Sequence, residues 1–217
     1  MRILFYSASA LSEAIARART AKASMYRSLV LESAEGLFAT RGYERTKIQD
    51  IAAASGLSLG TLYSVFNGKS DIYEAVHDER LGQLFLLTGG AMRSDASAAE
   101  RLMQGNRVFV QWLTERPDYL RIHLESGGDW SSNPRGAGEG LVRAWHRGIE
   151  LMAHVIEEAM NDGDLYRGDP VITARLMTAI QQVFISAWVE SGMENDAVSL
   201  TERIEEQLRR SLFRRTQ

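Results

Sequence analysis

Apolar side chains recur at intervals of three and four residues along most of this chain, and such spacing predicts amphipathic helices. The first clear stripe consists of Tyr26, Val30, Ala34, Leu37 and Phe38. Gly42 follows the stripe and can end a helix by adopting the left-handed conformation. Strand signals are few, and only three prolines occur among the 217 residues. We therefore expect an all-α protein whose first core helix begins near Met25.

Two short amphipathic segments come next, joined by a tight turn at Ser55 and Gly56. The first segment begins at Thr46, a candidate N-cap, and places Ile51 on its buried face. Gly56 can take the positive φ that ends this segment. Three helices packed on one small core would then span residues 25–66.

The second segment runs from Ser58, a candidate N-cap, to Asn67, and its two sides differ in character. The expected buried side is formed by Leu59, Leu62 and Phe66. The outer side is small and polar and consists of Gly60, Thr61, Ser64 and Asn67. Small side chains let a helix approach the floor of the major groove, where hydroxyls and amides meet base edges. The two segments therefore predict a helix-turn-helix that reads DNA.

This stretch resembles the DNA-binding domain of TetR-family transcriptional regulators. The resemblance rests on residues that occur in the family's order and spacing: Phe38, Gly42, Tyr43, Thr46, Ile51, Ala52, Gly56, Ser58, Gly60, Leu62, Tyr63, Phe66 and Lys69. It implies an all-α protein with an N-terminal three-helix DNA-binding domain and a C-terminal helical domain for ligand binding and dimerisation. Leu59 and Val65 depart from the family's usual pattern, so the resemblance does not indicate the operator sequence.

The resemblance also implies which residues meet DNA. Contacts to the phosphate backbone are implied for Thr46, Tyr63 and Lys69. The groove would be lined by Ser58, Gly60, Thr61 and Ser64. The expected DNA-binding set is completed by Lys47 and Asn67.

Three segments are expected along the chain: an extension at 1–24, the DNA-binding domain at 25–72, and the ligand-binding and dimerisation domain at 73–217. In the extension, four basic side chains outnumber one acidic side chain. One interpretation is a basic arm that follows DNA, as homeodomain arms do. The other, which we favour, is an extension that precedes the functional start of the domain.

The same periodicity predicts helices over about 70–93, 96–115, 117–126, 142–159, 169–192 and 199–215. The Gly-, Ser- and Asn-rich residues 127–140 predict a loop. Asp169 and Pro170 suit the N-cap and first turn of their helix. Residues 169–192 are apolar on nearly every side, which predicts burial against a partner. We expect a homodimer through about 169–192 and 199–215, because two recognition helices must meet grooves about 34 Å apart.

Aromatic side chains accompanied by a few polar groups are typical of small-molecule pockets. The ligand-binding candidates are Trp112, His123, Trp145, Gln181 and Phe184. Trp130 lies in the predicted loop and is a candidate lid, although an ordinary place in the core is the alternative for any single tryptophan. His146 and His154 each have a glutamate one helical turn later, but a third ligand is missing. We therefore expect neither a metal site nor a cofactor.

Composition narrows the class of protein. Residues 1–80 hold ten Lys and Arg against nine Asp and Glu, a net charge of +1, and the remaining 137 hold fifteen against nineteen, −4. This balance argues against nonspecific coating of nucleic acid. The absence of cysteine excludes disulfides and thiolate sites and agrees with a cytoplasmic location. No apolar run approaches the roughly 20 residues of a membrane span, so no membrane partner is expected.

The expected function is that of a ligand-responsive dimeric repressor, which binds a palindromic operator and is released by a small molecule. One alternative is a constitutive regulator without a ligand. Another is an enzyme that retains a vestigial helix-turn-helix. The sequence shows no nucleophile elbow, no H-E-x-x-H motif and no phosphate-binding glycine loop, so we do not expect an enzyme.

Overall fold

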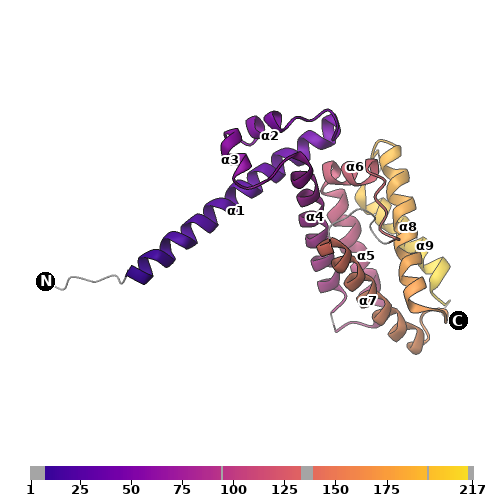
Figure 1. Cartoon of the computed structure of the whole chain (residues 1–217). Helices are drawn as coiled ribbons and strands as arrows, with labels where there is room; N and C mark the ends of the chain where they lie inside the picture. Colours follow the sequence, from indigo (N-terminus) through magenta and orange to yellow (C-terminus); the bar gives the residue numbers. More distant parts are fainter. Residues whose placement is uncertain (1–7, 94, 133–138, 195, 215–217) are drawn as a thin grey trace. The chain divides into compact units, whose positions relative to one another are not determined.

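The computed structural model describes residues 8–93, 95–132, 139–194 and 196–214, and its regular elements there are helices (Figure 1). These helices are α1 (Ala8–Arg41), α2 (Ile48–Ala54), α3 (Leu59–Tyr63), α4 (Lys69–Ala91), α5 (Ala98–Thr114), α6 (Pro117–Glu125), α7 (Glu139–Asp162), α8 (Pro170–Glu190) and α9 (Ala197–Leu212). An isolated bridge joins Leu165 to Phe213. The expectation of an all-α fold is confirmed. None of the helices in this described part is long and apolar enough to cross a membrane.

The chain divides into two compact units, Met1–Val76 and His77–Gln217. Helix α4 begins in the first unit and ends in the second. The predicted boundary at residue 72 therefore lies a few residues before the division and inside a helix.

Helix α1 begins at Ala8, so the expectation of a helix start near Met25 is wrong. The segment ahead of Met25 is rich in alanine, the residue with the highest helix propensity. Because of this composition, α1 continues without a break across residues 24 and 25, where the sequence predicts the boundary between the extension and the DNA-binding domain. The side chains from Leu11 to Met25 are exposed, so this part of α1 contributes nothing to the core.

The core of the first unit joins α1, α2, α3 and the start of α4. Its members are Val30, Leu31, Ala34, Phe38, Ile51, Ala52, Leu62, Phe66, Ile72, Ala75 and Val76. Gly42 (φ 78°) and Gly56 (φ 67°) adopt the left-handed conformation after α1 and α2, as the sequence predicts. The small three-helix unit is thereby closed by two tight turns.

In the second unit, α7 packs against α5 and α8, and α9 packs against α5 and α8. The α9 side chains Leu200, Ile204, Leu208 and Leu212 are all buried within the chain. The apolar stripe of α9 is thus used by the core of its own chain and does not form an exposed face.

Helix α8 begins as expected, because the Asp169 carboxylate accepts hydrogen bonds from the N–H groups of Val171 and Ile172 at 2.8 and 2.9 Å. Its other apolar residues are divided between two sides. Met177, Ile185 and Trp188 face the core. Ile172, Leu176 and Val183 remain exposed and, at intervals of four and seven residues, form one stripe along the helix.

Candidate DNA-binding surface and apolar cavity

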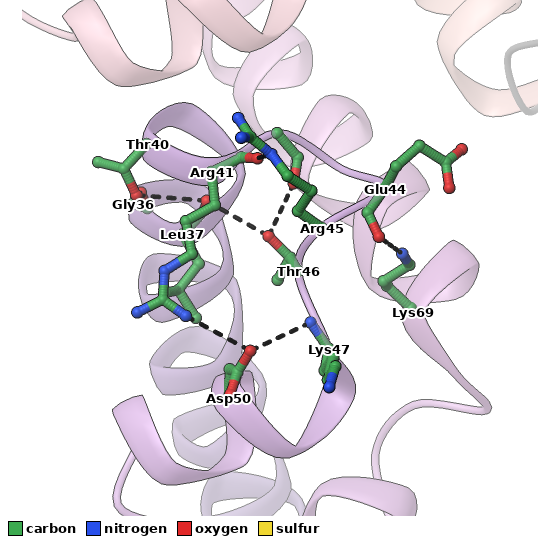
Figure 2. Close-up of polar contacts among 11 residues, drawn as sticks. Gly36, Leu37, Thr40, Arg41, Glu44, Arg45, Thr46, Lys47, Asp50 and Lys69 are labelled. Carbon is green, nitrogen blue, oxygen red and sulfur yellow. Dashed lines mark hydrogen bonds and ion pairs between the residues drawn. The ribbon is translucent and has the colours of Figure 1, made fainter.

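The start of α2 is organised differently from the expectation. Lys47 is the N-cap of α2, and its N–H donates to Asp50 Oδ2 at 3.3 Å (Figure 2). Thr46 lies one residue earlier with only 1 % of its surface exposed, and its hydroxyl donates to the main-chain oxygen of Gly42 at 2.8 Å. The prediction that Thr46 is the N-cap is therefore wrong. Its side chain is almost fully buried, and its contact with a phosphate stays a prediction.

Asp50 also joins α2 to the end of α1. Its Oδ2 lies 3.4 Å from Nη1 of Arg41 (Figure 2). Arg45 Nε in turn donates to the main-chain oxygen of Arg41 at 2.8 Å. Such exposed contacts add little stability, but they set the position of the turn that leads into α2.

Helix α3 is capped as the sequence predicts, because Ser58 Oγ accepts the N–H of Thr61 at 3.1 Å. The helix is shorter than expected and ends at Tyr63. Ser64 Oγ donates to the main-chain oxygen of Thr61 at 2.6 Å, which closes the last turn. Asn67 belongs to the next turn, since its N–H and Nδ2 both donate to Asp71 Oδ2, at 2.8 and 3.0 Å.

The outer side of α3 and the turn after it carries no charged side chain between residues 58 and 67. Its exposed members are Ser58, Leu59, Gly60, Tyr63, Ser64 and Asn67, with Thr61 half-buried. Leu62 and Phe66 are buried as expected, but Leu59 is 38 % exposed and does not share their face. The structure thus brings together six of the nine predicted DNA-binding residues, with an apolar Leu59 among them.

Lys69, the first residue of α4, holds the loop that follows α1. Its Nζ donates to the main-chain oxygens of Tyr43 and Glu44 at 2.7 and 3.4 Å, the second of which is drawn in Figure 2. The same ammonium lies 4.1 Å from the centroid of the Tyr43 ring. Lys69 therefore has a structural role in the first unit, and its contact with a phosphate stays a prediction. Lys47 is exposed.

The second unit contains a cavity of about 50 Å³ between α4, α5, α7, α8 and the segment around Trp130. Its lining is mostly aromatic, methionine and aliphatic. Among the described residues that line it, none is charged, and the polar members are Thr88, Asn106, Thr178 and Gln181. Gly105 also lines it, and a Cβ there would lie only 2.8 Å from Met92 Cγ.

Two of the five predicted ligand-binding residues, Trp145 and Gln181, line this cavity, and so does Trp130. Contrary to expectation, Trp112, His123 and Phe184 do not.

Each of these three has another neighbour. The Trp112 ring centroid lies 5.7 Å from that of Tyr119. His123 stacks on Trp130 at 4.3 Å with an interplanar angle of 13°, outside the lining. The Phe184 ring centroid lies 5.5 Å from Arg203 Cζ. Trp112 and His123 are thus buried in the core beside other aromatic rings, and Phe184 is half-buried beside Arg203.

Sequence reasoning missed Asn106, which is the partner of Gln181. Gln181 Nε2 donates to Asn106 Oδ1 at 2.9 Å, and each side chain is 2 % exposed. The signal for Asn106 is weak, because it is a single amide on the buried face of α5 and its partner lies in a distant helix.

Two histidines of the second unit, the buried His123 and the half-buried His77, are neutral at neutral pH. Burial, followed by the charge of His77, lowers the pKa of His123 to about 3. Burial lowers the pKa of His77 to about 4. The surroundings of the cavity therefore offer no positive charge from these rings.

The helix-turn-helix unit matches the family described as bacterial regulatory proteins, tetR family, over residues 30–76. The transcriptional regulator TtgR of Pseudomonas putida is 34 % identical over 170 residues, which cover 75 % of this chain and 80 % of TtgR. The fatty acid metabolism regulator protein of Bacillus subtilis is 22 % identical over 82 % of this chain and 91 % of its own length.

Solved structures agree with the fold. SmeT, the repressor of the Stenotrophomonas maltophilia multidrug efflux pump SmeDEF, superposes with a TM-score of 0.67 at 18 % identity over 87 % of this chain and 90 % of SmeT. A tetR-family regulatory protein from Rhodococcus RHA1 gives 0.69 at 21 % identity, over 85 % of this chain and 95 % of its own. The matching family and the relative TtgR are transcriptional regulators, the class of DNA-binding protein that a helix-turn-helix unit indicates. The chain belongs to the TetR family.

Proposed function

We propose that the protein is a dimeric repressor that binds a palindromic operator in the cytoplasm and leaves it when a small molecule enters the cavity. The observation that carries the DNA-binding part is the uncharged outer side of α3, held in place by the Ser58 cap. A recognition helix contacts base edges with its N-terminal residues, and here these are small or hydroxyl-bearing. Tyr63, at the end of α3, and Lys47, at the start of α2, are exposed and can reach phosphates.

The exposed stripe of α8 supports a dimer. Ile172, Leu176 and Val183 leave apolar surface in contact with water unless a second copy covers it. A two-fold axis would also explain a palindromic operator, because each subunit would read one half-site. Since the leucines of α9 are buried within the chain, α9 would take part through its other side chains.

The cavity supports the effector part of the proposal. Helix α4 is continuous from Lys69 to Ala91 and contributes Phe85 and Thr88 to the lining. A ligand that displaced α4 would change the position of its first residues, which belong to the DNA-binding unit. The coupling needed is about 1–3 kcal/mol. TtgR is named a transcriptional regulator and SmeT a repressor of a multidrug efflux pump, which agrees with a repressor.

Substitutions on α3 test the DNA-binding part. Thr61→Ala and Tyr63→Ala should each weaken binding to DNA that the wild-type protein selects from a random pool, by about tenfold. The matched control is Ser28→Ala, because Ser28 is exposed on α1. Affinity is measured by fluorescence anisotropy at one fixed salt concentration. If both α3 variants bind like the wild type, the assignment of α3 as the recognition helix fails.

A further inference from the structure

Two buried amide side chains of the cavity lining are hydrogen-bonded to each other. Asn106 comes from α5 and Gln181 from α8, and the hydrogen bond between them is 2.9 Å long. Each amide has a second polar atom that is buried and has no hydrogen-bond partner: Nδ2 of Asn106 and Oε1 of Gln181. Buried amide atoms are normally paired, so this pair is incomplete by one donor and one acceptor.

The missing partner has the same chemistry whichever way the amides are oriented. If both side chains were rotated by half a turn, Asn106 would donate to Gln181, and the unpaired atoms would be Asn106 oxygen and Gln181 nitrogen. One donor and one acceptor would still be left. A molecule that completes the pair must therefore offer one acceptor and one donor.

Among the other polar groups of the lining that the structure describes, most are already paired and one is not. The hydroxyl hydrogens of Thr88 and Thr178 are already donated to the main-chain oxygens of Leu84 and Arg175, both at 2.9 Å. Trp145 Nε1 is also engaged. The indole Nε1–H of Trp130 is buried without a partner, which adds a further donor and no charge.

We propose that the effector is an uncharged, largely apolar molecule whose hydroxyl or primary amide group is held by Asn106 and Gln181. This inference rests on the proposed function, since it names the class of small molecule that the cavity admits. A hydroxyl or an amide both accepts and donates, and so meets both amides at once.

Charged molecules fit this lining less well. A carboxylate accepts hydrogen bonds but donates none, so the Gln181–Asn106 pair would keep an unmet acceptor next to an anion. A quaternary ammonium ion offers no hydrogen-bond donor or acceptor. None of the described lining residues carries a charge that would offset the loss of hydration of either ion.

The test compares three probes at neutral pH that share an ethylphenyl body and differ in the para substituent: 4-ethylphenol, ethylbenzene and 4-ethylbenzoate. Binding to the full chain without DNA is measured by calorimetry. We expect 4-ethylphenol to bind about tenfold more tightly than either of the others. The double variant Asn106→Leu/Gln181→Met removes both amides at similar volume, and it should keep ethylbenzene binding while losing the preference for 4-ethylphenol. The matched control Thr88→Val should keep that preference.

Equal binding of the three probes, tightest binding of 4-ethylbenzoate, binding of none, or a preference that survives in the double variant would overturn the inference. The comparison of probes in the wild-type protein stands even if the double variant does not fold. Operator binding is measured separately on the same samples. Failure to bind DNA, or to release it with 4-ethylphenol bound, counts against the proposed function and leaves the ligand preference intact.

Discussion

The indole Nε1–H of Trp145 donates a hydrogen bond of 3.1 Å to the main-chain oxygen of Trp130. This bond joins α7 to the segment that forms one wall of the cavity. Gln182 holds the same segment from α8, because its Nε2 donates to the main-chain oxygen of Gly128 at 3.2 Å. Trp130 is thus anchored from two helices and forms a wall of the cavity, whereas the sequence suggests a lid.

The first prediction concerns this anchor. Trp145→Phe removes the donor and leaves the main-chain oxygen of buried Trp130 without it, so the free energy of unfolding should fall by about 1–3 kcal/mol beyond the loss of ring area. The measurement is urea unfolding followed by circular dichroism. Trp112→Phe is the matched control, because Trp112 is equally buried but its Nε1 has no hydrogen-bond partner. Equal losses in the two variants would show that the bond contributes nothing measurable.

The second prediction concerns the cap of α3. Ser58→Ala should lower the free energy of unfolding by about 1 kcal/mol, because the N–H of Thr61 loses its acceptor. It should also weaken operator binding, since α3 has only five residues and depends on its cap. Ser64→Ala serves as the comparison, as its exposed hydroxyl donates to a main-chain oxygen at the other end of the helix. A cap variant as stable as the wild type would refute this account of α3.

The third prediction concerns pH. The pKa of His123 is lowered to about 3 and that of His77 to about 4, both mainly by burial, whereas an unfolded histidine titrates near 6.5. Below pH 6.5 the unfolded chain therefore binds more protons than the folded chain. The contribution of these two histidines to the free energy of unfolding should be fully present above pH 6.5 and should decline as the pH falls toward 3. Between pH 7 and pH 5 the loss should be about 2 kcal/mol for each histidine.

Unfolding by urea at these two pH values measures that loss. His123→Gln should remove about half of the pH dependence, whatever it does to stability at pH 7. A pH dependence that is identical in the wild type and His123→Gln would contradict the assigned cause.

The fourth prediction concerns the stripe on α8. Val183→Lys should place a charge within the proposed dimer interface and shift the protein to the monomer in sedimentation experiments. Leu86→Lys is the control, since Leu86 is a similarly exposed apolar side chain, 74 % against 66 % for Val183, and lies on α4 outside the proposed interface of α8 and α9. Monomer formation in both variants, or in neither, would argue against a dimer through α8.

The helices of the second unit were predictable because their apolar spacing is regular. The stripe from Leu200 to Leu212 and the Asp169–Pro170 start of α8 follow from spacing and capping alone. The start of α1 at Ala8 does not follow from the residues that resemble the family, because these lie after Met25. It follows from the helix propensity of the alanine-rich stretch before Met25.

The sites were predictable to a lesser extent. Ser58 was predicted correctly as the cap of α3, but the helix ends at Tyr63 rather than at Asn67. The choice between Thr46 and Lys47 as N-cap of α2 depends on backbone angles, which composition does not reveal. Asn106 and Gln181 lie 75 positions apart in the sequence, so no local sequence pattern predicts their hydrogen bond.

Gly105 has a consequence for how this regulator can change its response. Any side chain at this position would displace Met92, whose flexible thioether lines the cavity, while the amides of Asn106 and Gln181 come from other positions. The size of the cavity and the amide pair that we propose to recognise the effector therefore depend on different residues. A single substitution at Gly105 could therefore change the size of the molecule that the cavity accepts, while the amide pair and its chemical selectivity stay the same.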